Sequence, residues 1–90
     1  MKYLLKAPNP FNPTTRINYD LPKATHVNLT VFNVLGQTVT TLKDGFMEAG
    51  SHSITWNGTD NGGATVASGI YFYRIEADDF QATKKMMMLK

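Results

Sequence analysis

The fold class is decided by the segment Ile70-Tyr71-Phe72-Tyr73-Arg74-Ile75, which is the strongest β segment in the chain. Aromatic and β-branched residues of this kind favour strands. Because side chains alternate between the two faces of a strand, Tyr71 and Tyr73 share one face and Phe72 takes the other. The segment therefore predicts a strand that packs most of its aromatic rings into a core.

Apolar and polar residues also alternate on both sides of this segment. In the stretch that begins at residue 26, the apolar parity changes between Val31 and Phe32, which indicates a bulge or a strand covered on both faces. Period-two patterning predicts strands at 3–5, 16–21, 26–34, 37–42, 52–56, 70–75 and 80–89.

Gly and Asn mark the connections between these strands. Asn57-Gly58-Thr59-Asp60-Asn61-Gly62-Gly63 is expected to be a surface turn, since both residue types tolerate positive φ. Lys43-Asp44-Gly45 and Ala49-Gly50 are expected to bracket a loop around Phe46 and Met47. About seven strands at this spacing predict an all-β fold, an antiparallel sandwich of two sheets.

A Pro- and Asn-rich opening segment, residues 7–15, interrupts the alternation. Its prolines cannot donate to a strand ladder, and each biases the preceding residue toward extended geometry. The segment is therefore expected to be a rigid crossing, pinned to the core by Phe11.

Composition limits the classes of function. The 90 residues, 42% hydrophobic and 18% charged, are enough for one domain over residues 1–90. Zero Cys removes disulfides and thiolate metal sites, and the sequence predicts no cofactor. The net charge of +2 without a strong basic cluster argues against nucleic acid, and no apolar run is long enough to insert into a membrane.

Candidate catalytic residues lack the partners that catalysis needs. His26 and His52 could each act as a general base, but no nucleophile motif accompanies them, so exposed strand positions are the favoured interpretation. Asp60 and Asn61 lack the spacing of a Ca²⁺ loop, which favours a simple turn. The sequence predicts that the domain is not an enzyme.

Trp56 and the aromatic residues of 71–73 also fit a second class, an adhesive or carbohydrate-binding module, because flat rings stack on sugars. Consecutive rings alternate between the two faces of the strand, so they cannot form one continuous binding surface. A small sandwich also needs its large side chains inside. Core packing is therefore the favoured interpretation of these rings.

Three segments together resemble a known family. Pro8-Asn9-Pro10-Phe11-Asn12-Pro13-Thr14-Thr15, Val31-Phe32-Asn33-Val34-Leu35-Gly36-Gln37 and Lys85-Met86-Met87-Met88-Leu89-Lys90 resemble the type A C-terminal sorting domain of type IX (Por) secretion substrates. The resemblance implies an Ig-like sandwich attached to an upstream cargo, exported to the periplasm and carried across the outer membrane to the cell surface or medium. It implies the outer-membrane translocon and a sortase-like peptidase as partners.

The same resemblance implies which residues are recognised. The sorting motifs place them at Pro8, Asn9, Pro10, Gly36, Gln37, Lys85, Met86, Met87, Met88, Leu89 and Lys90. Burial is the simpler interpretation of the apolar members of these motifs, including Val34 and Leu35. An edge strand at the end of the chain could also form a weak homodimer.

A second resemblance leads to a different function. Residues 56–63, followed by Val66-Ala67-Ser68-Gly69-Ile70-Tyr71, resemble the Ig-like domain of the flagellar hook-capping protein. That resemblance implies an assembly module, in which the last residues of the chain would have no special importance.

Overall fold

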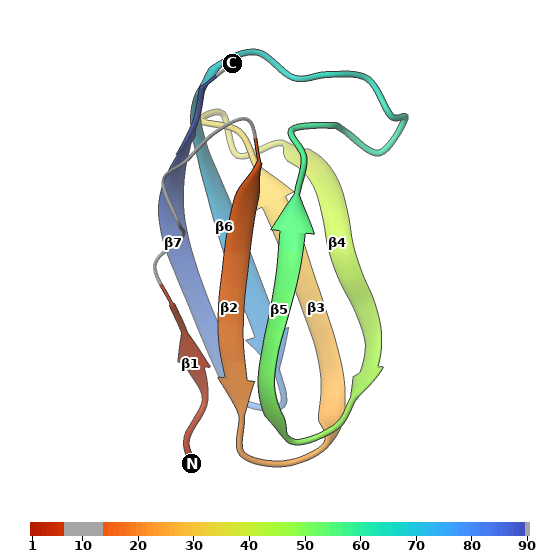
Figure 1. Ribbon diagram of the computed structural model, residues 1–90, viewed down its shortest axis with the longest axis vertical. Helices are drawn as coiled ribbons and strands as arrows, with labels where there is room; N and C mark the ends of the chain where they lie inside the picture. The colour runs from red at the N-terminus through yellow and green to blue at the C-terminus, as the bar shows by residue number, and fades with distance from the viewer. Residues whose placement is uncertain (7–13, 90) are drawn as a thin grey trace.

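The computed structural model describes residues 1–6 and 14–89, which form two antiparallel sheets packed face to face (Figure 1). The strands of these residues are β1 (Leu4–Leu5), β2 (Thr15–Leu21), β3 (Thr25–Phe32), β4 (Thr38–Met47), β5 (Gly50–Trp56), β6 (Gly69–Ala77) and β7 (Phe80–Met88). One sheet has the order β1-β2-β5 and the other β4-β3-β6-β7. The predicted all-β, two-sheet sandwich is confirmed.

Alternating side chains from both sheets fill the space between them. In β2, and in β6 from Tyr71 onward, every second residue is buried, as a strand with one covered face requires. The largest fully buried side chains are Trp56, Tyr19, Tyr73, Ile17, Leu21, Leu29, Ile75, Met88, Val27, Val31 and Thr15. None of the described residues forms a helix long and apolar enough to cross a membrane.

The aromatic residues join the two sheets, as predicted for core rings. Trp56 of β5 meets Tyr71 of β6 edge to face, with ring centroids 5.1 Å apart. The indole of Trp56 donates to the carbonyl of Thr59 at 2.9 Å, and the Tyr71 hydroxyl donates to the carbonyl of Ala67 at 2.6 Å. The polar atoms of these buried rings are thus satisfied by the connection between β5 and β6.

The prediction of a loop around Phe46 and Met47 is wrong, because β4 continues to Met47. Its second half pairs with the first half of β3, from Thr25 opposite Met47 onward, so its main-chain groups find partners in the sheet. Gly45, one of the residues that suggested a break, lies within the strand opposite Val27.

The prediction of a bulge in β3 itself is wrong, because β3 pairs with β6 in unbroken register from Val27 to Phe32. The register of β3 with β4 shifts between Leu29 and Thr30 and again between Val31 and Phe32, and the extra residues, Leu42 and Val39, belong to β4. β3 ends at Phe32, two residues earlier than predicted, because a turn begins at Asn33.

Candidate functional site

Two of the three predicted recognition segments meet at one end of the four-stranded sheet. Phe32, the last residue of β3, pairs with Phe72 of β6, and Phe72 pairs with Lys85 of β7. The turn after β3, the connection from β5 to β6 and the end of β7 therefore gather at the upper end of Figure 1. Pro8, Asn9, Pro10, the predicted anchor Phe11 and Lys90 lie outside the described residues.

The turn of residues 33–37 is organised by the side chain of Asn33. Its Oδ1 accepts the main-chain N–H groups of Leu35 and Gln37, each at 3.0 Å, and its Nδ2 donates to Oε1 of Gln37 at 2.8 Å. Gly36 has a φ of 80°, in the region that favours glycine. Gly36 and Gln37 therefore have structural roles in this turn, whatever else they contact.

The tip of this turn is apolar and exposed. Val34 is 65% exposed and Leu35 is 78% exposed, so the expectation that packing holds them is wrong. The turn extends beyond the last rung of β3, where the facing sheet offers no cover.

Alternation divides the closing segment into two sets of residues. Met86 and Met88 lie in the core, at 3% and 0% exposure, as the packing interpretation predicts. Lys85, Met87 and Leu89 point to the opposite face and are exposed. Of the residues of this segment that the structure describes, only these three can meet a partner without the sheets opening.

Their neighbours on β6 extend this outward face. Ile70 pairs with Met87, and Phe72 pairs with Lys85. The Arg74 guanidinium lies 4.6 Å from the centre of the Phe32 ring, a cation–π contact. We call Ile70, Phe72, Lys85, Met87 and Leu89 the outer-face patch; it is apolar, with a lysine in it.

A polar groove of about 570 Å³ lies beside the turn of residues 33–37. The loop between β5 and β6 forms its other wall. The lining residues are Asn33, Gln37, Thr38, Val39, Asp60, Asn61, Gly62, Val66 and Tyr71.

Hydrogen bonds hold the loop wall of this groove in place. Asn61 bonds to β4 as a neighbouring strand would: its N–H donates to the Val39 carbonyl at 3.0 Å, and its Oδ1 accepts the N–H of Thr41 at 3.2 Å. Oδ1 of Asp60 accepts the N–H groups of Gly62 and Ala64, each at 2.9 Å, so Asp60 forms the predicted turn. Within the described ranges, no group of three His, Cys, Asp or Glu residues is placed to hold a metal ion.

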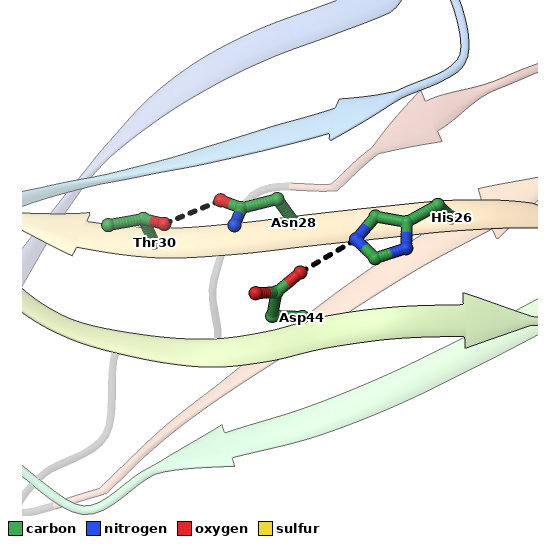
Figure 2. A network of polar contacts seen from close by, with 4 residues as sticks. All are labelled: His26, Asn28, Thr30 and Asp44. Carbon is green, nitrogen blue, oxygen red and sulfur yellow. Dashed lines mark hydrogen bonds and ion pairs between the residues drawn. The ribbon is translucent and has the colours of Figure 1, made fainter.

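The two histidines occupy strands, and neither faces a nucleophile. His26 of β3 lies 2.6 Å from Oδ1 of Asp44 on β4, and both side chains are more than 60% exposed (Figure 2). The nearby Thr30 hydroxyl donates to Asn28 instead. His52 Nε2 donates to the carbonyl of Glu48 at 2.7 Å. Among the described residues, these contacts form no catalytic arrangement.

Three tyrosines and one ion pair have shifted pKa values, and burial is the largest cause of the rise in the pKa of Tyr3. Burial raises the pKa of Tyr73 to about 12 and also raises the pKa of Tyr19. Lys23, between β2 and β3, places its ammonium group 2.8 Å from Oδ2 of Asp78, between β6 and β7. This contact lowers the pKa of the Asp78 carboxyl group. None of these groups lies in the outer-face patch or lines the polar groove.

Sequence reasoning missed the polar groove and the link from Asn61 to β4. The residues 57–63 predicted a turn, but nothing in their order says which strand the turn reaches.

A search of curated proteins finds no match to this chain.

Comparison with solved structures finds the same fold in other proteins, among them PorU and FlgD. Dimeric latent PorU from Porphyromonas gingivalis matches with a TM-score of 0.71 and 20% identity, over 94% of this chain and 9% of that chain. FlgD from P. aeruginosa matches with a TM-score of 0.69 and 22% identity, over 94% of this chain and 68% of that chain. At these identities the likeness shows the fold alone.

The sequence itself matches a family model. The model of the FlgD Ig-like domain matches residues 9–80. The second resemblance, carried by residues 56–71, is the one that this match supports. Because the match spans well over half of the sequence, the chain belongs to the FlgD Ig-like domain family, and its sandwich is an Ig-like domain.

Proposed function

We propose that this domain is a non-catalytic C-terminal sorting signal, which directs an attached upstream cargo protein across the outer membrane through the type IX secretion system. The proposal rests on one observation above all: Lys85, Met87 and Leu89 of the closing motif face outward and are exposed. The proposed partners are the outer-membrane translocon and a sortase-like peptidase that removes the domain. The proposed route leads through the periplasm to the cell surface or medium.

The chemistry of the outer-face patch favours recognition over mere packing. The open face of a half-covered sheet is usually polar, because nothing there replaces water. Met87 at 53% exposure, Leu89 at 47% and Ile70 at 39% depart from this rule on adjacent strands. Clustered apolar exposure rimmed by polar groups is typical of protein interaction sites. The exposed Val34 and Leu35 add a second apolar feature at the same end.

The fold is compatible with the proposal. PorU carries the name of the Por system to which the sorting motifs point, and a domain of this fold lies within that chain. A sandwich without disulfides suits a carrier role, since it can fold beside an unrelated cargo.

A secretion assay tests the proposal with variants chosen by face. A fluorescent carrier is fused upstream of residues 1–90 behind a Sec signal, in a bacterium that has the type IX machinery. The test variant combines K85A, M87S and L89S. The control combines Q81A and T83A, which change outward-facing residues at the other end of the same strand. Thermal unfolding establishes that both variants fold.

We expect the parent and the control to reach the surface or medium and the test variant to stay in the periplasm. Export of the folded test variant at the parent level would refute recognition through this face. A further fusion lacking residues 84–90 measures the contribution of the whole segment, provided that it folds.

A second candidate function is an assembly module of the hook-capping type, which the family match favours. This alternative predicts that the domain joins a multi-subunit structure and that residues 84–90 can be removed without loss of function. Retention of the parent fusion in the periplasm would favour it over sorting. The weak homodimer through an edge strand stays a prediction, and light scattering at high protein concentration tests it.

A further inference from the structure

Three side chains that line the polar groove each have one terminal atom in a hydrogen bond and a second polar atom for which the described residues supply no partner. Oε1 of Gln37 accepts Nδ2 of Asn33, Oδ1 of Asn61 accepts the hydroxyl of Thr40 and the N–H of Thr41, and Oδ1 of Asp60 accepts two main-chain N–H groups. No hydrogen bond among the described residues uses Nε2 of Gln37, Nδ2 of Asn61 or Oδ2 of Asp60.

These unused atoms are two amide donors and one carboxylate acceptor. Their side chains already have restricted rotamers, because each is held by the bonds at its other atom. A ligand that met them would therefore lose less side-chain entropy on binding than one that had to order three free side chains.

We propose that this groove binds a neutral carbohydrate through neighbouring hydroxyl groups. A hydroxyl both donates and accepts, so a pair of them can donate to Oδ2 of Asp60 while accepting from the amides of Gln37 and Asn61. The site is separate from the outer-face patch and does not depend on the sorting proposal.

The size and lining of the groove agree with such a ligand. Its volume of about 570 Å³ lies in the range of small-molecule sites. Val39 and Val66 supply apolar surface for the C–H groups of a sugar ring. Most of the other lining residues are polar, which suits a polyol better than the apolar side chains of a peptide.

Isosteric substitutions can separate the structural atom of each side chain from its ligand-facing atom. Q37E keeps an oxygen for Asn33 and N61D keeps one for Thr40 and Thr41, but both lose the unused donor. D60N keeps the oxygen that accepts from Gly62 and Ala64 and loses the unused acceptor. Q81E makes the same chemical change as Q37E on exposed β7, outside the groove.

The experiment is a titration of the ¹⁵N-labelled domain, followed by NMR, with glucose, galactose, mannose, N-acetylglucosamine and maltotriose in turn. We expect at least one sugar to shift the side-chain amide signals of Gln37 and Asn61 in a saturable manner at millimolar concentration. We expect each groove variant to bind about three- to tenfold more weakly, the effect of one lost hydrogen bond, and Q81E to bind as the parent does.

Two results would overturn the proposal. One is the absence of any saturable shift at these two side chains with all five sugars. The other is a shift that Q37E and N61D leave unchanged or strengthen, since added carboxylates strengthen the binding of a cation and weaken that of a polyol. The backbone amide spectrum of each variant reports whether it folds, and the titration of the parent decides the matter even if a variant does not.

Discussion

The hydroxyl of Tyr73 donates a hydrogen bond of 2.7 Å to the main-chain carbonyl of Lys6, although 67 residues separate them. Tyr73 is fully buried on β6, in the middle of the four-stranded sheet, and Lys6 directly follows β1 in the other sheet. The bond therefore fastens the first strand to the core. We expect Y73F to lower the free energy of unfolding by about 1 kcal/mol, measured by urea denaturation. An unchanged value would mean that water replaces the hydroxyl at no cost.

Buried tyrosines should make the domain sensitive to alkali. The pKa of Tyr73 is about 12 in the folded chain against 10.0 for a free tyrosine, so the unfolded state loses its proton first. The contribution of Tyr73 to stability is thus fully present below pH 10 and disappears as the pH rises toward 12. We expect a fall of about 2–3 kcal/mol across this window, at about 1.4 kcal/mol for each pH unit.

Urea denaturation from about pH 9 to about pH 12 measures this fall. In Y73F the curve should be flatter, because the variant lacks the tyrosine whose pKa is raised to about 12, while the raised pKa values of Tyr19 and Tyr3 remain. Equal slopes in the parent and in Y73F would contradict the assignment to Tyr73.

The three consecutive methionines should differ sharply in their effect on stability. Met88 is fully buried and Met87 is 53% exposed. We expect M88A to cost about 2–5 kcal/mol, because it leaves a cavity in the core, and M87A to change stability by less than about 0.5 kcal/mol. Chemical denaturation of the two variants side by side checks this. Similar costs would mean that β7 does not keep this register.

The turn after β3 should depend on backbone conformation at Gly36. Its φ of 80° disfavours residues with a side chain, although a Cβ there would meet nothing within 4 Å. We expect G36A to cost about 1–2 kcal/mol and G36N to cost less, since asparagine tolerates this conformation. Thermal unfolding of both variants measures the difference. Equal effects would point to a contact of the turn with another part of the chain.

The Asn33 side chain should contribute separately to the same turn. N33A removes the acceptor for two main-chain N–H groups and the donor to Gln37. Because the turn is exposed, water can replace part of these bonds, and we expect a loss of about 1 kcal/mol. N33D, which keeps the acceptor, should recover most of it in urea denaturation.

Local pattern was sufficient for most of the fold. Alternation and β-branched content identified the strands, but the change of parity at Phe32 marks no bulge in β3, since the extra residues opposite this strand belong to β4. Local pattern also failed at 43–47, where composition suggests a break but pairing with β3 holds the segment extended. Propensity describes a residue and its neighbours, whereas this pairing depends on a strand almost twenty residues away.

The candidate site was predictable only where it follows strand parity. The division between Met86 and Met87 follows from alternation once the strand is known, and the end of the sheet at which Lys85 lies follows from strand order. The polar groove depends on how the loop of residues 57–68 folds over β4. The pairing of His26 with Asp44 likewise depends on register between two strands, which no single segment contains.

Asn61 has a consequence for how copies of this domain behave when they are crowded. β4 is an edge strand of its sheet among the described strands, and the main-chain groups at Val39 and Thr41 that bond to Asn61 could otherwise pair with a strand of another molecule. The loop thus acts as a local guard against strand-to-strand aggregation. Shortening a loop is a common way to make a small domain more rigid, but here it would expose an adhesive edge and lower solubility.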